Sequence, residues 1–383
     1  MKILIAPGAF KRSLSASAAA QAIQRGLERS GIEAELYLLP IADGGNGTLD
    51  AFLANGGERI CMIVNDPLGR SVESAYGLLN VDGGQTAVIE MALASGMELL
   101  RPDEYDPLRA STYGTGELLA AALEAGARRF IIGVGGSATV DGGAGCLQAL
   151  GVRLLDENGA KLPAGIGGGD LNRVRTIDAA ALDNRWRECE VIIASDVDNP
   201  MLGEQGAAAV FGPQKGASPD DVRVLDGSLR HFFTLVRDQI GVDVLNVRGG
   251  GAAGALSAGL MAFIGGRIES GIDLLLAHNH FDDLLKDADL IITGEGQIDE
   301  QTVQGKGPIG VARRGREYGV PTVAIVGGLN ADDVLLHEAG ISAVLPIVTG
   351  PMTLDEALVR ADELLERTAL RLGYMLQLNR SIN

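Results

Sequence analysis

The sequence predicts an α/β protein of two domains, one of them a Rossmann-like, doubly wound parallel sheet. Short apolar runs that end in glycine or aspartate alternate with helical patterns along the 383 residues, as expected when a crossover helix follows each strand. A chain of this length is too long for one compact core. Aromatic residues make up only 4% of it, so the cores must be aliphatic, which suits parallel sheets covered by helices.

The expected elements are spaced regularly at both ends of the chain and irregularly between. Apolar runs predict strands at 2–6, 35–41, 130–134, 190–194, 290–293 and 322–326. Helical periodicity lies between or after many of them, at 16–30, 117–127, 309–318 and 355–372. The middle has hairpin-like pieces, such as 77–81 and 85–90 across the turn Asp82–Gly83–Gly84. We therefore expect a discontinuous Rossmann-like domain over 1–62 plus 285–383 and an inserted α/β domain over 63–284.

Charge and cysteine content narrow the class of protein. The net charge is −18, and no basic cluster offsets it, which argues against a nucleic-acid or anionic-membrane partner. The three cysteines (Cys61, Cys146, Cys189) show no CxxC spacing, which argues against a disulfide framework or a zinc site. The uncharged segment 249–266 is rich in glycine and alanine and shorter than a spanning helix needs. These observations predict a cytoplasmic protein without a membrane partner.

The loop Gly133–Gly145, GVGGSATVDGGAG, carries the strongest chemical signal. It joins an apolar run to a helix-like segment, and a glycine-rich turn at a helix N-terminus is a backbone cradle for phosphate. Asp141 in this loop would repel a phosphate unless a divalent cation lies between them, so the loop predicts a metal-bound nucleotide. The residues expected to hold phosphate here are Gly135, Gly136, Ser137 and Thr139.

The same loop also fits a dinucleotide-binding fingerprint. Gly133, Gly135 and Ala138 satisfy the G-x-G-x-x-G/A pattern, and the later run 152–155 ends at Asp156, near the expected ribose-binding acid. A lone match of this kind is a weak signal, and Asp141 would face the pyrophosphate with no metal to mediate. A nicotinamide-dependent hydroxy-acid dehydrogenase is therefore one alternative.

Three further loops place carboxylates directly after apolar runs, in ADGGNGT (42–48), SDVDNP (195–200) and TGEGQIDEQ (293–301). Asp43 and Glu295, with Asp141, are predicted metal neighbours, and Asp196 or Asp198 is the predicted general base. Asp299 is predicted at the substrate. Each acid could equally stabilise its own turn or a helix N-terminus.

Three lysines lie in Gly- and Pro-containing loops instead of on helix faces: Lys11, Lys215 and Lys306. A lysine held by a rigid loop can act as a point-charge clamp for a phosphoryl group or a substrate carboxylate. We predict that Lys215 and Lys306 bind phosphate and that Lys11 acts at the reacting groups and the substrate. Together, acidic loops and lysine clamps match what phosphoryl transfer requires.

Eight motifs, in this order, make the sequence closely similar to the bacterial glycerate kinase family of the type that yields 2-phosphoglycerate. They are IAPGAFKRSLSA (5–16), ADGGNGT (42–48), STYGTGEL (111–118), GVGGSATVDGGAG (133–145), SDVDNP (195–200), FGPQKGA (211–217), GGGAAGAL (249–256) and TGEGQIDEQT (293–302). The resemblance runs essentially end to end. It implies ATP- and Mg²⁺-dependent phosphorylation of D-glycerate, with the active site in the cleft between two α/β domains. A homo-oligomer is compatible with it, and the oligomeric state stays open.

Four positions depart from the family pattern. The family usually reads APDSFK, ADGGEGT and GEGRID, where this chain has Gly8 and Ala9, Asn46, and Gln297. If the missing groups bind metal or the substrate carboxylate, a related small hydroxy acid is an alternative substrate. A catalytically silent sensor that keeps the fold is a further alternative. The regiochemistry of the product and the pathway are not written in the residues.

Overall fold

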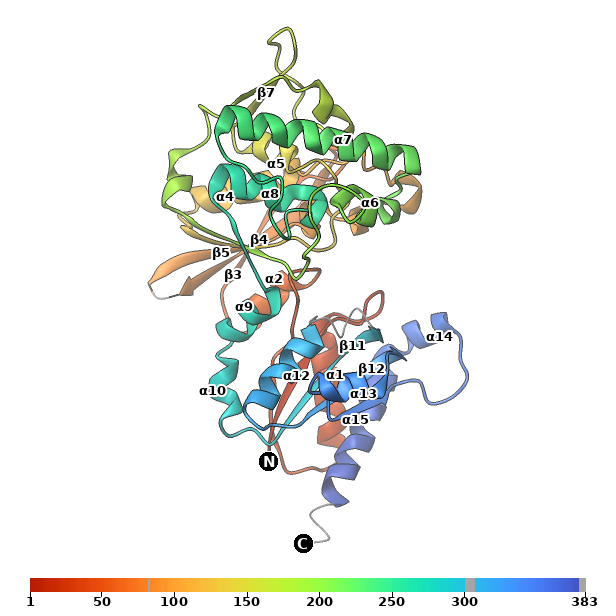
Figure 1. The fold of residues 1–383 in the computed structure, drawn as a ribbon. Helices are drawn as coiled ribbons and strands as arrows, with labels where there is room; N and C mark the ends of the chain where they lie inside the picture. The colour runs from red at the N-terminus through yellow and green to blue at the C-terminus, as the bar shows by residue number, and fades with distance from the viewer. Residues whose placement is uncertain (82, 300–306, 379–383) are drawn as a thin grey trace. The chain divides into compact units, whose positions relative to one another are not determined.

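The structure, a computed structural model, describes residues 1–81, 83–299 and 307–378, and it divides into two compact units (Figure 1). The first unit contains Met1–Asp43, Asp50–Asn55 and the described residues from Ile272 onward. The second contains Gly44–Leu49 and Gly56–Gly271. The expected boundaries, at 62 and 285, differ from this division, because the strand β3 (Glu58–Asn65) pairs within the sheet of the second unit.

A five-stranded sheet in the order β13-β12-β11-β1-β2 forms the centre of the first unit, and all its pairings are parallel. Its strands are β1 (Lys2–Pro7), β2 (Glu35–Leu38), β11 (Leu290–Asp299), β12 (Thr322–Asn330) and β13 (Ala343–Pro346). Parallel strands that connect through helices need both sheet faces covered. The predicted Rossmann-like arrangement of these strands is confirmed.

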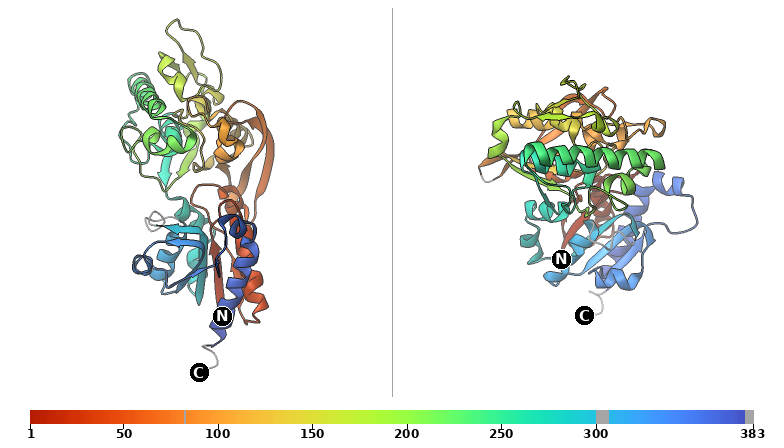
Figure 2. Two further views of the ribbon diagram at one scale, coloured as in Figure 1. Left: turned by 90° about the vertical axis from the view of Figure 1, so that its right-hand side faces the viewer. Right: turned by 45° about the horizontal axis from the view of Figure 1, so that its top comes forward.

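Helices cover both faces of this sheet. On one face, α1 (Ala16–Arg29) and α15 (Ala361–Leu378) lie side by side (Figure 2) and share a core cluster with Ile3, Ile5 and Ile292. On the other face, α12 (Gly307–Glu317) packs with α13 over Ala324 and Val326. The remaining helices of the unit are α9 (Gly271–His278, beginning at the boundary), α10 (Phe281–Leu285), α13 (Asp333–Glu338) and α14 (Leu354–Val359).

The long helix predicted at 355–372 is interrupted. α14 ends at Val359, and α15 begins at Ala361. Arg360 between them has φ −98° and ψ 10°, outside the helical region. Thr353 begins α14 with a capping box, in which its side chain and that of Glu356 each accept a backbone N–H. The apolar periodicity of the sequence continues through Arg360, so it does not predict the break between α14 and α15.

The second unit has a six-stranded sheet in the order β10-β9-β6-β5-β4-β3. β5, β6, β9 and β10 are parallel neighbours, whereas β3, β4 and β5 form an antiparallel meander. The other strand bounds are β4 (Ser71–Val81), β5 (Gly84–Glu90), β6 (Arg129–Gly133), β9 (Glu190–Ala194) and β10 (Arg267–Glu269). The predicted hairpin at 77–90 is confirmed, although Asp82 of its turn lies outside the described residues.

A separate two-stranded sheet joins β7 (Arg153–Leu155) to β8 (Thr176–Asp178), and this pair is antiparallel. In a dinucleotide-binding fold, the strand after the glycine-rich turn and its helix would join the same parallel sheet as β6. β7 instead lies outside the six-stranded sheet. The segment Gly133–Ala138 therefore matches the dinucleotide-binding pattern without forming the βαβ unit that binds a dinucleotide.

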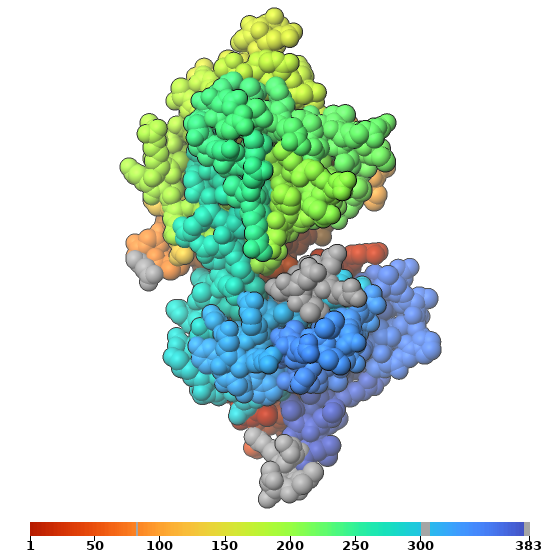
Figure 3. Space-filling model, in the orientation of Figure 1, coloured from red at the N-terminus to blue at the C-terminus, as the bar shows by residue number. Residues whose placement is uncertain are grey.

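The helices of the second unit form two layers above its sheet. α4, α5 and α8 share one core cluster with the strands, and α7 covers α5 and α8 through a second cluster that contains Leu229 and Phe233. Figure 3 shows α7, in green, on the outer surface of this unit. The α-helical bounds are α2 (Thr48–Leu53, shared with the first unit), α3 (Ala92–Ser95), α4 (Tyr113–Glu124), α5 (Ala144–Ala149), α6 (Ala207–Phe211), α7 (Pro219–Leu235) and α8 (Ala252–Ile264).

Short 3₁₀ and π turns complete the unit: η1 (Met97–Leu99), η2 (Pro102–Glu104), η3 (Gly168–Arg173), η4 (Asn184–Glu188), η5 (Pro213–Lys215) and η6 (Val236–Ile240). Among the helices of the described ranges, none is both long and apolar enough to span a bilayer.

Candidate active site

The glycine-rich loop after β6 lies against the loop Gly44–Gly47 in the second unit. The backbone N–H of Gly135 donates to the carbonyl oxygen of Gly44 at 2.9 Å. A Cβ atom at Gly135 would lie 2.5 Å from the Cα of Gly45, and one at Gly136, where φ is +77°, would lie 2.2 Å from Asn46 Oδ1. Two loops that the sequence singled out separately are therefore in contact, and glycine is what permits the close approach.

Hydrogen bonds within the second unit occupy part of the predicted phosphate cradle. The N–H of Gly135 is used by Gly44, and the carbonyl of Gly136 accepts from Met97 N at 3.0 Å. For the N–H groups of Gly136 and Ser137, the described part of the chain supplies no hydrogen-bond acceptor. Gly136 is exposed. Ser137, in contrast, is 7% exposed, so an anion would meet Gly136 first.

Lys215 lies directly behind these amides. Its Nζ donates to Ser137 Oγ and to the carbonyl oxygen of Thr139, both at 2.7 Å, and the side chain is 3% exposed. Burial lowers the pKa of Lys215 to about 7, and the nearby Asp141 carboxylate opposes that shift. The structure thus brings together Lys215, Ser137 and Thr139, as the sequence predicted for a phosphate site, but it places the amine beneath the loop.

Asp141 is completely buried and has four hydrogen-bond donors. Oδ2 accepts from the N–H and Oγ1 of Thr112, both at 2.8 Å, and from Gly145 N at 3.2 Å, while Oδ1 accepts from Gly143 N at 3.0 Å. Burial raises the pKa of this carboxyl, and the four hydrogen bonds oppose the rise. A carboxylate with this environment organises its own loop. We therefore do not carry Asp141 into the metal-binding set expected from the sequence.

Glu90 is a residue of this region that the sequence reasoning missed. Its carboxylate is 4% exposed and accepts from Gly47 N at 3.0 Å and Leu49 N at 2.9 Å. It ends β5, directly opposite Gly133 of β6. The signal that could have found it is the single charge that closes the apolar run 86–89. Glu90 fixes the loop that supports Gly135 and Gly136.

The two candidate bases follow β9 and differ in their partners. Ala194, the last residue of β9, pairs with Gly133, the last residue of β6. Asp196 follows two residues after Ala194, so its loop starts next to the glycine-rich loop. Asp196 is exposed. Asp198 forms an exposed ion pair with Arg248, Oδ2 to Nη2 2.5 Å, and its carbonyl accepts from Gly249 N. This ion pair raises the pKa of Arg248. Both carboxylates are exposed after β9, so both stay candidates for the base.

The loop after Arg248 contains a strained turn that packs against the glycine-rich loop. Ala253, Gly254 and Ala255 all have positive φ values, between 53° and 68°. Left-handed conformations of this kind are costly for alanine. The carbonyl of Gly254 accepts from Gly142 N at 2.9 Å, and a Cβ at Gly254 would lie 2.1 Å from the carbonyl oxygen of Thr139. Close packing against the phosphate loop holds this turn in place.

In the first unit, the predicted residues lie at the carboxyl edge of the five-stranded sheet. Gly8 N donates to the carbonyl of Gly294 at 2.7 Å, and a Cβ at Gly296 would lie 3.2 Å from Lys11 N. The segments that carry Lys11 and Glu295 are thus adjacent. The chain after β2 continues along β1 as far as Ile41, whose N–H donates to Pro7 O, so Asp43 reaches the same edge. Lys11 is exposed, and Asp43, Glu295 and Asp299 are half-buried. Lys306 lies outside the described residues.

Across residues 1–81, 83–299 and 307–378, no group of three or more His, Cys, Asp or Glu side chains is arranged to hold a metal ion. Mg²⁺ is usually held by one or two carboxylates together with substrate phosphates and water. Asp43 and Glu295 at the sheet edge match this coordination by one or two carboxylates. Asp141 does not, because both of its carboxylate oxygens accept hydrogen bonds from the protein.

Comparison with known proteins decides the class. The sequence profile described as "Glycerate kinase family" matches residues 3–377. The chain belongs to the glycerate kinase family. It is 47% identical to the glycerate kinase of Halalkalibacterium halodurans over 380 residues, which are 99% of each chain. It is 46% identical to the glycerate 2-kinase of Escherichia coli over 359 residues, 93% of each chain.

The fold agrees with this family. A crystal structure of a "putative glycerate kinase 2" from Salmonella typhimurium superposes with a TM-score of 0.85 at 44% identity, covering 100% of this chain and 99% of that one. The predicted α/β class and the predicted phosphotransferase are confirmed. A glycerate kinase implies an ATP phosphoryl donor. The dehydrogenase and the silent sensor lose their support.

The four departures from the family pattern can now be placed. A Cβ at Gly8 would lie 3.6 Å from the carbonyl oxygen of Gly294 and 3.9 Å from Glu295 Cβ, which is ordinary contact. Gly8 therefore leaves space that a side chain would fill beside Glu295. Asn46 and Gln297 are exposed. The structure gives no further reason for Ala9.

Proposed function

We propose that this protein transfers the γ-phosphoryl group of ATP to D-glycerate. The observation that carries the proposal is the pair of backbone amides at Gly136 and Ser137, which the described chain leaves without acceptors, above the buried amine of Lys215. Backbone N–H groups stabilise phosphate charge without reorganisation, and the amine of Lys215 adds to this in its protonated form. The phosphates of the nucleotide are assigned to this loop.

Mg²⁺ is proposed to be held by Asp43 and Glu295 at the carboxyl edge of the first unit. When bound with ATP, it neutralises charge on the phosphate oxygens. Thr139 belongs to the phosphate set through its carbonyl, which fixes Lys215. Lys306 stays a predicted phosphate clamp.

Asp196 is proposed as the general base. It accepts the proton of the glycerate hydroxyl while that oxygen forms a bond to the γ-phosphorus, and the bond from the γ-phosphorus to the bridging oxygen breaks with ADP as the leaving group. We assign the hydroxyl at C2, which the name of the Escherichia coli relative, glycerate 2-kinase, supports. Asp198 keeps its loop in place through Arg248.

Lys11 is proposed to bind the carboxylate of glycerate, because it is exposed and its segment packs on the loop that carries Glu295. Asp299, at the end of β11, is proposed to accept a hydrogen bond from the second glycerate hydroxyl. A lysine and a carboxylate together match the two ends of a small dihydroxy acid.

A coupled ADP-release assay tests the proposal across D-glycerate, tartronate and lactate. We expect release with D-glycerate and at least tenfold lower kcat/KM with the other acids. Preferential release with tartronate or lactate would assign the protein to a related hydroxy acid. No release with any acid would overturn the proposed function.

A further inference from the structure

A cavity of about 580 Å³ lies in the second unit, and no residue predicted from the sequence lines it. We propose that this cavity binds the adenosine part of the nucleotide. Its volume is in the range of small-molecule sites. The proposal rests on the proposed kinase function, because it places the nucleoside of the same ATP. The lining residues that carry the argument are Leu68, Tyr105, Asp106, Leu108, Arg109 and Gly216.

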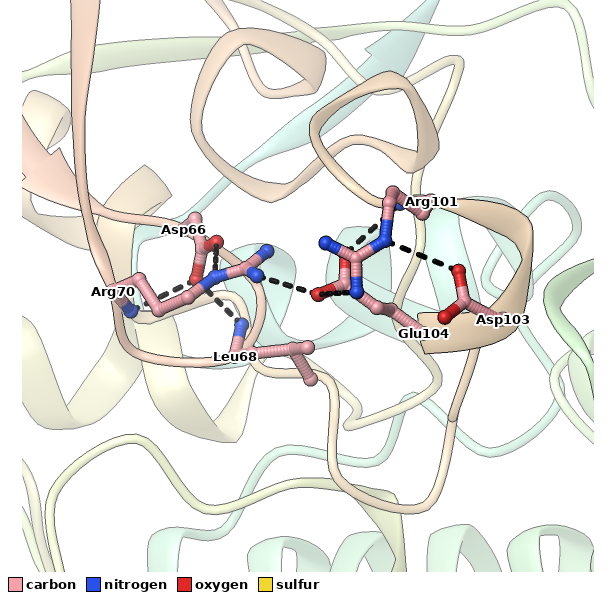
Figure 4. Close-up of polar contacts among 6 residues, drawn as sticks. All are labelled: Asp66, Leu68, Arg70, Arg101, Asp103 and Glu104. Carbon is pink, nitrogen blue, oxygen red and sulfur yellow. Dashed lines mark hydrogen bonds and ion pairs between the residues drawn. The ribbon is translucent and has the colours of Figure 1, made fainter.

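The walls of the cavity are held by a chain of ion pairs. Figure 4 shows Arg70 between Asp66 and Glu104, with Nε 2.6 Å from Asp66 Oδ2 and Nη1 2.7 Å from Glu104 Oε1. Arg101 continues the chain to Glu104 and Asp103, both at 3.2 Å. The N–H of Leu68 donates to Asp66 at 2.8 Å. These contacts join the 66–70 turn to η2, whose residues Asp103 and Glu104 line the cavity.

Three polar groups in the cavity are not used by the rest of the described chain: the Tyr105 hydroxyl, Asp106 Oδ2 and the Arg109 guanidinium. Asp106 uses only Oδ1, which accepts from Leu108 N at 3.1 Å. A tyrosine ring offers a stacking surface for a base, and a carboxylate accepts hydrogen bonds from ribose hydroxyls. Arginine suits the phosphate nearest the ribose. Leu68 and Leu108 supply the apolar surface that a purine needs.

The cavity adjoins the phosphate loop through one residue. Gly216 lines the cavity, and the preceding residue, Lys215, reaches Ser137 Oγ at 2.7 Å. A Cβ at Gly216, where φ is +96°, would lie 2.6 Å from the carbonyl oxygen of Tyr105, so Gly216 lets η5 pack directly on the cavity wall. A nucleotide whose phosphates sit on Gly136 and Ser137 therefore has its nucleoside site next to the same lysine.

The test measures ADP binding by titration calorimetry and the KM values for ATP and D-glycerate. In Tyr105→Ala and Arg109→Gln, we expect the Kd for ADP and the KM for ATP to rise about tenfold or more, with the KM for D-glycerate unchanged. Tyr105→Phe keeps the ring and should keep wild-type ADP binding. Tyr374→Ala, which removes an exposed tyrosine of the first unit, is the matched control.

Hydrogen exchange gives a readout that does not depend on a variant. ADP added to the wild-type protein should slow amide exchange over 104–109 and 216–221. Unchanged exchange there, or wild-type ADP affinity in Tyr105→Ala and Arg109→Gln, would overturn the adenosine site while leaving the kinase intact. A wild-type protein that binds ADP at this cavity without phosphorylating D-glycerate would overturn the proposed function alone.

Discussion

The two units present charged loops at the carboxyl ends of their strands, and the loops differ in burial. In the second unit, Asp141 is 0% exposed and Lys215 is 3% exposed, and both are hydrogen-bonded within the protein. In the first unit, Lys11 is exposed and Glu295 is half-buried at the sheet edge. The first pair is engaged in hydrogen bonds within its own unit, and the second pair is the one proposed to bind substrate and metal.

One sequence signal therefore corresponds to two physical roles. A charged residue in a glycine-rich loop after an apolar run describes Asp141 and Glu295 equally well. The difference lies in the four donors that reach Asp141, two of them from Thr112, which is 29 residues earlier in the chain. Contacts over that separation have no local pattern. Complete burial and four donors mark Asp141 as a structural carboxylate.

The largest expected effect is on turnover in Asp196→Asn. If this exposed residue accepts the proton of the reacting hydroxyl, kcat should fall by roughly 10²–10⁴ with the melting temperature unchanged. Steady-state ADP release together with thermal unfolding checks this. Near-normal turnover would place Asp196 with the residues that only maintain structure.

Lys215→Met tests the buried side of the comparison through pH. Because burial lowers the pKa of Lys215 to about 7 from 10.5, the folded protein binds fewer protons at this amine than the unfolded chain between pH 7 and 10.5. The free energy of unfolding should rise with pH across that window and fall as pH decreases toward 7. The rise amounts to about 3 kcal/mol between pH 7 and pH 10, and the variant should lack it.

Urea unfolding of both proteins at pH 7, 8.5 and 10 measures this difference. Asp141 is the charged group that faces the amine, and it remains in the variant. Parallel stability curves for wild type and variant would show that the amine is not buried as described.

Lys11→Gln should raise the KM for D-glycerate about tenfold, since a charge-assisted hydrogen bond to a carboxylate is worth roughly 1.5–3 kcal/mol. The melting temperature and the KM for ATP should stay at wild-type values, because the side chain is exposed. A changed KM for ATP with an unchanged KM for D-glycerate would move Lys11 to the phosphates.

The smallest effect is expected in Asp198→Asn. Its ion pair with Arg248 is exposed on both sides, and such pairs contribute about 0–1 kcal/mol. Turnover should change less than twofold, in contrast to Asp196→Asn. A loss of turnover as large as that of Asp196→Asn would reverse the assignment of the base.

Local pattern was enough to predict several strands and helices of both units. β9 has the bounds that its apolar run predicts, and β6, α1 and α12 lie within two residues of theirs. The break at Arg360 was not predictable, because the apolar spacing continues through it. The apolar run at 152–155 overlaps β7, but its antiparallel pairing with β8 depends on tertiary contacts.

The candidate site was predicted in its residue types more than in its contacts. Ser137, Thr139 and Lys215 were predicted to bind phosphate, and the structure brings them together. The burial of Asp141 and the support from Glu90 depend on backbone donors far away in the chain. The cavity beside Tyr105 is bordered by segments 66–70 and 101–104, which ion pairs join, and of the residues that carry its argument only Gly216 lies in a quoted motif.

The most direct test of the two roles compares Asp141→Asn with Glu295→Gln by thermal unfolding and kcat measured on the same preparations. In Asp141→Asn, an amide NH₂ would face backbone donors, so the free energy of unfolding should fall by about 3 kcal/mol. In Glu295→Gln, stability should stay at the wild-type value while kcat falls at least tenfold. A stable Asp141→Asn protein that is inactive, beside an active but unstable Glu295→Gln protein, would contradict the account.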